Sequence, residues 1–94
     1  MFKYILTEVR QDANIPFYEF PQSFYDYIDG THPESKFTEV IDQDNKRRVR
    51  TSEWDTETSY VSMINDPIVI AGGEDKINYN NQNGITWTTQ FIPK

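Results

Sequence analysis

The stretch KRRVRTSEWDTETSYVSMI, residues 46–64, decides the predicted fold, because a strand pattern and a helix pattern meet in it. Its first half alternates between the two sides of a strand, with Arg48, Arg50 and Trp54 on the same side. The basic run KRRVR is typical of a solvent-facing or edge strand, where charge discourages unwanted pairing. The first half therefore predicts a strand with a solvated basic face.

The second half of the stretch changes to a helical pattern. Asp55 or Thr56 can accept a hydrogen bond from the free amides of a first helical turn. Tyr60 and Ile64 then recur at helical spacing. Pro67 is expected to end this helix within a residue or two.

The chain before this stretch predicts a strand, a helix and a second strand. Residues 2–10 carry apolar groups on both sides, as a central strand does. Pro21 suits the first position of a helix, and Gly30 suits its end. Residues 37–42 alternate as a strand, and the polar DQDN that follows predicts a turn to the basic strand. The helix carries an apolar stripe, which is either core or the roof of a ligand pocket: Phe20, Phe24, Tyr27 and Ile28.

The chain after the stretch predicts a connection and a last strand. Residues 68–71 are a short apolar run without clear identity, and residues 72–84 are polar and rich in Asn. Such a long connection is expected to be either a functional lid or a mobile loop. Residues 85–92 alternate again, with good strand formers.

The composition of the chain limits which classes of function are expected. The chain has 94 residues, which predicts a single domain over residues 1–94, and no Cys, so neither disulfides nor thiolate-bound zinc are expected. A net charge of −6 argues against a nucleic-acid partner. We expect no membrane span, because no apolar run approaches about 20 residues. Without a recognisable export signal, the expected location is the cytoplasm.

The predicted order of elements is strand, helix, strand, strand, helix, strand. This βαββαβ order predicts an α+β, ferredoxin-like fold, with a four-stranded antiparallel sheet and two helices on one face. The other face is expected to be apolar and to pack against a second copy of the chain through a two-fold axis. Its apolar side chains are expected to include some of Phe2, Tyr4, Leu6, Trp87 and Phe91.

With these elements, the chain resembles the dimeric α+β barrel superfamily, of which the antibiotic-biosynthesis monooxygenase-like proteins are a branch. Beyond the architecture, the resemblance rests on SEWDTETSYVSMI, where a Trp ends the third strand before an acidic helix start. It implies a ligand or active site between sheet and helices, with Trp54 and Tyr60 facing Phe20, Phe24 and Tyr27. Haem-degrading members use a His on the second helix, whereas no His follows residue 32 here, so no haem or other cofactor is expected.

The first functional hypothesis is a pocket that binds a small molecule without chemistry. The aromatic content of 15% suits an apolar or amphipathic ligand, such as a fatty-acid-like or polyketide-like compound. Arg50 or Arg48 shares the strand face of Trp54 and can meet a carboxylate on such a ligand.

The second hypothesis is a cofactor-independent monooxygenase or isomerase. Tyr60 or His32 would move the proton, and Arg50 would stabilise the developing negative charge. His32 is expected in a surface loop, yet it is the only side chain that titrates near neutrality without perturbation. No metal site is predicted. A third hypothesis is a structural dimer with no open pocket.

Overall fold

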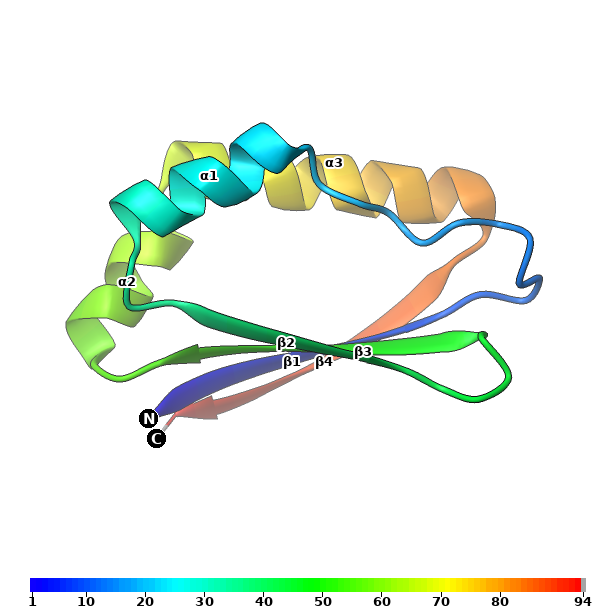
Figure 1. Cartoon of the computed structure of the whole chain (residues 1–94), viewed down its shortest axis with the longest axis horizontal. Helices are drawn as coiled ribbons and strands as arrows, with labels where there is room; N and C mark the ends of the chain where they lie inside the picture. Colours follow the sequence, from blue (N-terminus) through cyan, green and yellow to red (C-terminus); the bar gives the residue numbers. More distant parts are fainter. Residues whose placement is uncertain (94) are drawn as a thin grey trace.

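The computed structural model describes residues 1–93 and has one four-stranded antiparallel sheet with its helices on one side (Figure 1). The strand order β2-β3-β1-β4 is that of the ferredoxin-like fold, as predicted. The helices and strands, in chain order, are β1 (Phe2–Val9), α1 (Gln22–Thr31), β2 (Lys36–Ile41), β3 (Arg47–Trp54), α2 (Glu57–Ile64), α3 (Pro67–Asn83) and β4 (Thr86–Pro93).

The junction between β3 and α2 forms as its sequence predicts. Trp54 ends β3 and is paired with Phe2 of β1. The side-chain oxygen of Thr56 accepts a hydrogen bond from the backbone amide of Ser59 at 3.1 Å, which caps the first turn of α2. The cap and the change from period two to helical spacing therefore account for this turn of the chain.

The region after α2 differs from the prediction. Instead of a short apolar run and a long connection over residues 72–84, the structure has α3, a helix of 17 residues. Pro67 starts this helix rather than only ending α2, because a first-turn Pro needs no hydrogen bond from its nitrogen. Asp66 caps it by accepting from the amide of Ile68 at 2.9 Å, and Gly84 ends it in the left-handed region with φ of 69°.

Helix α1 also differs at both ends from its prediction. Pro21 lies at the N-cap with extended backbone, one residue before the helix, and not at the first helical position. Gly30 does not end the helix, which continues through it to Thr31. Ile28 is buried in the core, as the apolar stripe predicts.

Strand register places the large apolar side chains of the sheet toward the helices. Tyr4 is paired with Phe91, and Glu8 is paired with Trp87, so all four lie on the helix side together with Leu6. The expectation that these aromatics cover the bare face is therefore wrong. The hydrophobic core lies between this side of the sheet and the helices, around Ile28, Trp54 and Met63.

The bare face of the sheet is built mainly from β-branched residues. Paired positions across the strands bring together Ile5, Thr7, Val40, Val49 and Thr51. No described helix covers this face, because α1, α2 and α3 all lie on the other side (Figure 1). Its centre carries no charge, whereas Lys36 and Glu53 are cross-strand neighbours near one end.

The basic run does not form a solvated face. Strand β3 lies inside the sheet, between β2 and β1, and Arg48 has no exposed surface. Its guanidinium donates to carboxylate oxygens of Glu8 and Glu19 and to the backbone oxygen of Tyr18. The prediction of a solvent-exposed basic side chain is correct for Arg47, which points to the bare face and forms an ion pair with Asp42.

Candidate functional site

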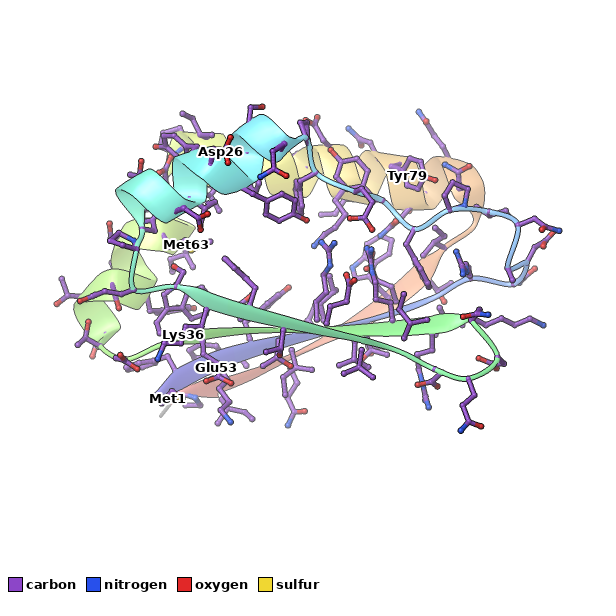
Figure 2. All side chains as sticks on the ribbon, viewed as in Figure 1. Met1, Asp26, Lys36, Glu53, Met63 and Tyr79 are labelled. Carbon is purple, nitrogen blue, oxygen red and sulfur yellow. The ribbon has the colours of Figure 1, made fainter. Side chains whose placement is uncertain are left out.

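A cavity of about 480 Å³ lies between the sheet and the helices. Side chains enter it from both layers, and Figure 2 shows Met63 pointing inward from α2 while Asp26 lies on the outer side of α1. The structure therefore does not support the hypothesis of a dimer with a closed interior.

One end of the cavity is an aromatic wall. Trp54 is 4% exposed, and its indole nitrogen donates to the hydroxyl of Ser35 at 2.9 Å. Tyr60 packs edge-on against Trp54, with ring centroids 5.2 Å apart, and stacks on Phe91 at 4.9 Å. These contacts hold the rings in place, so this wall needs little rearrangement to receive a ligand.

The helix side of the cavity is also apolar. Phe20 and Phe24 stack with centroids 4.3 Å apart, and both line the cavity. Ile28 of α1 and Val69 and Gly73 of α3 complete this side. Of the predicted ligand-binding residues, the cavity brings together Trp54, Tyr60, Arg50, Phe24 and Phe20.

Arg50 supplies positive charge at the cavity wall. Its Nε donates to Glu39 at 2.9 Å, and its Nη2 donates to the hydroxyl of Tyr25 and to Glu19, both at 3.3 Å. Burial alone would lower the pKa of Arg50, but the hydrogen bond to Glu39 and the neighbouring Tyr25 and Glu19 outweigh it, so the pKa is raised. Arg50 therefore stays charged next to an apolar space.

Lys76 is a second cationic residue of the cavity wall, and the sequence analysis missed it. It lies on α3, one turn after Gly73, and its Nζ is 5.7 Å from the ring centroid of Phe20. Burial lowers the pKa of Lys76 to about 8, with Arg50 and Arg48 adding to the effect and Glu8 opposing it. Recognising Pro67 as a helix start would have placed Lys76 on the inner stripe of α3.

His32 and Tyr27 do not line the cavity. His32 is 7% exposed, so its predicted surface position is wrong. Its Nε2 lies 2.7 Å from Oδ2 of Asp66, and the hydroxyl of Tyr27 donates to the same oxygen at 2.6 Å. The hydrogen bonds from Tyr27 and His32 lower the pKa of Asp66 to about 2. The three residues join the end of α1 to the start of α3, and they form a structural contact outside the cavity.

Within residues 1–93, no three or more His, Asp or Glu side chains are arranged to hold a metal ion. The described helices also include none with the length and apolar character that crossing a bilayer requires.

Structural comparison finds similar solved proteins. A Deinococcus radiodurans protein provisionally assigned as an antibiotic biosynthesis monooxygenase has a TM-score of 0.59 and 12% identity, over 100% of this chain and 92% of that chain. A dimeric ferredoxin-like protein from an uncultured marine organism has a TM-score of 0.49 and 16% identity, covering 99% and 94%. The first likeness shows the same ferredoxin-like fold. No protein-family model matches the sequence, and no curated protein matches it significantly.

Proposed function

We propose that the protein is a homodimer in which each subunit binds a small amphipathic molecule, with an apolar body and an anionic head, between sheet and helices. The single observation that carries the ligand proposal is the cavity of about 480 Å³ with an aromatic wall and Arg50 beside it. This volume falls in the range of about 300–1,000 Å³ in which proteins bind small molecules. Fatty-acid-like and polyketide-like carboxylates fit this description.

The position of Arg50 supports an anionic head group. Arg50 is held by Glu39 and Glu19, yet its side chain keeps 17% of its surface exposed next to the cavity. A ligand carboxylate can accept a hydrogen bond from the guanidinium while the apolar body contacts Trp54 and Phe24. The ligand is therefore expected to lie with its carboxylate toward β3 and its tail toward the aromatic wall.

The ligand proposal is tested by comparing a carboxylate with its neutral ester. Calorimetry with dodecanoate and methyl dodecanoate is carried out on the wild type and on Arg50→Met. We expect the variant to lose roughly tenfold in affinity for the carboxylate, the size of a charge-assisted hydrogen bond, and little for the ester. Arg47→Met, on the bare face, is the matched control and leaves both affinities unchanged. Equal affinities of the variant and the wild type for dodecanoate would contradict the proposed orientation.

A cofactor-independent monooxygenase or isomerase is the second candidate. It is favoured by Tyr60, whose ring lies on the cavity wall, and by Arg50 and Lys76, which can stabilise an enolate. The fold shared with the Deinococcus protein agrees with this candidate. A panel of quinols and enols, assayed with and without oxygen, tests it. Turnover that Tyr60→Phe leaves unchanged would exclude Tyr60 as the proton-transfer residue.

The bare face supports the homodimer part of the proposal. It is a broad surface of β-branched side chains on a sheet that water would otherwise contact directly. A second copy related by a two-fold axis presents the same surface and covers it. A small domain also gains stability from such association.

A further inference from the structure

Lys76 combines access to the cavity with the lack of a close counter-ion. Its side chain is half-buried on the inner stripe of α3, and its Nζ lies near the ring of Phe20. Among residues 1–93, no carboxylate oxygen is within 4.0 Å of this nitrogen, whereas Glu8 pairs with Arg48 and Glu39 pairs with Arg50. The nearby carboxylates are thus engaged by the arginines, and the amine of Lys76 faces an apolar space.

The charges around Lys76 come from several elements of the fold. They are Glu8 on β1, Glu39 on β2, Arg48 and Arg50 on β3, and Glu19 and Tyr25 before and within α1. Burial disfavours the charged amine and is the largest effect on the pKa of Lys76, which is lowered to about 8; Glu8 opposes this shift, and the two arginines add to it. Roughly a tenth of Lys76 is then the free amine at pH 7, far more than for an ordinary lysine.

We propose that Lys76 is a nucleophile that condenses reversibly with the carbonyl group of an apolar aldehyde or ketone bound in the cavity. This inference rests on the proposed ligand binding and adds a chemical class to it. A lysine amine that is desolvated next to other cationic groups is an activated nucleophile for carbonyl carbon. The aromatic wall and Phe20 receive the apolar part of such a molecule.

The reaction is a condensation that releases one water molecule. The lone pair of Nζ forms a bond to the carbonyl carbon, and the π electrons move to the oxygen, which takes a proton from the amine nitrogen. The hydroxyl group of this carbinolamine then leaves as water with the second proton, which gives an imine. Arg50 lines the same cavity from β3 and stabilises the negative charge that develops on the oxygen. No oxidant or reductant takes part.

The inference is tested by trapping the imine. The full-length protein is incubated with 2-naphthaldehyde at pH 7, reduced with sodium borohydride and mapped by peptide mass spectrometry. We expect Lys76 to be labelled at least about tenfold faster than the exposed Lys36 and Lys46, as its larger free-amine fraction requires. Lys76→Arg keeps the positive charge and loses the fast label, whereas Lys36→Arg, the matched control, keeps it. Labelling spread evenly over the lysines overturns the inference.

A non-reactive analogue separates this inference from ligand binding itself. Calorimetry with 2-naphthalenemethanol measures occupancy of the cavity without chemistry. Binding of the alcohol together with no preferred label at Lys76 rejects the nucleophile and leaves the ligand proposal intact. Absence of both rejects the nucleophile, and the ligand proposal is rejected with it only where dodecanoate also fails to bind. Binding of the alcohol, with labelling concentrated at Lys76, supports both.

Discussion

Arg48 and Glu8 form an ion pair without solvent contact, in which Nη2 of Arg48 lies 2.7 Å from Oε1 of Glu8. The Nε of Arg48 donates to the same oxygen at 3.0 Å. The second oxygen of Glu8 accepts a hydrogen bond from the side-chain amide, Nδ2, of Asn80 at 3.0 Å. The three residues belong to β3, β1 and α3. The pair therefore connects two central strands to the helix layer beside the cavity.

Removing one partner of this pair is expected to destabilise the fold strongly. Glu8→Leu leaves a buried guanidinium with less compensation, which costs about 3 kcal/mol or more in the free energy of unfolding. The double variant Glu8→Leu/Arg48→Met replaces the pair by apolar side chains and is expected to be more stable than Glu8→Leu alone. Urea unfolding measures the free energies of Glu8→Leu, Arg48→Met and the double variant. A double variant that loses the sum of the two single losses would contradict this account.

The exposed pair of Arg47 and Asp42 is the control for that experiment. Its side chains are 56% and 33% exposed, although the distance from Nε to Oδ2 is the same 2.7 Å. Arg47→Met is therefore expected to change the free energy of unfolding by no more than about 1 kcal/mol. Because the two ion pairs have the same distance, a larger loss of stability on breaking the Arg48–Glu8 pair is caused by its burial.

Two adjacent glycines of α3 are expected to respond in opposite ways to alanine. A Cβ on Gly72 would lie 2.9 Å from Cζ of Phe24 and closer still to its Cε1, whereas a Cβ on Gly73 meets nothing within 4 Å. Gly72→Ala is expected to cost about 1–3 kcal/mol through overpacking against α1. Gly73→Ala is expected to raise the free energy of unfolding by at most about 1 kcal/mol, because Ala has a higher helix propensity than Gly. Thermal unfolding measures both, and equal melting temperatures would contradict the predicted packing.

Asp66 is expected to make stability depend on pH in the acid range. Its pKa is lowered from 3.8 to about 2, chiefly by the hydrogen bonds from Tyr27 and His32. The unfolded chain therefore binds more protons between these values, so stability rises with pH from about 2 to about 4 and is lost as pH falls through that window. In Asp66→Asn, stability is expected to change little with pH between about 2 and 4. The control variant Asp29→Asn, at an exposed position, is expected to keep the pH dependence of the wild type. Melting temperatures measured from pH 2 to 5 test the assignment, which an unchanged slope in Asp66→Asn would reject.

The bare face is expected to hold two copies of the chain together. Thr51→Lys places a positive charge at its centre, and a two-fold axis brings the two new charges close to each other. Sedimentation velocity is expected to show a dimer for the wild type and a monomer for this variant. Val61→Lys, on the exposed surface of α2, leaves the dimer intact. A monomeric wild type at tens of micromolar would contradict the proposed interface.

The sequence was sufficient to predict those structural features that depend on neighbouring residues. Alternation in β3, the cap at Thr56 and the aromatic stripe of α1 follow from neighbouring residues, and the structure agrees with them. The βαββαβ order could be predicted because it depends on the same local signals, whereas the expectation that Trp54 and Tyr60 lie between sheet and helices came from the resemblance to the dimeric α+β barrel superfamily.

The burial of polar residues could not be predicted, because their partners are distant in the sequence. Arg48 meets Glu8 across 40 positions, and His32 meets Asp66 across 34 positions, so composition alone made both look solvated. Helix α3 was missed for a related reason. Its Gly and Asn residues disfavour a helix locally, and the contacts of Gly72 and Asn80 with other elements offset this preference.

Strand β2 forms one edge of the sheet, and all six of its residues are exposed. Three of them, Phe37, Thr38 and Glu39, line the cavity, and β2 makes its ladder hydrogen bonds to β3 alone. Strand β2 can therefore separate transiently from β3 while the Glu8–Arg48 pair between β1 and β3 stays closed, at a free-energy cost below that of global unfolding. We expect a bulky ligand of the proposed site to enter the cavity when β2 separates from β3, while the core around Ile28, Trp54 and Met63 stays packed.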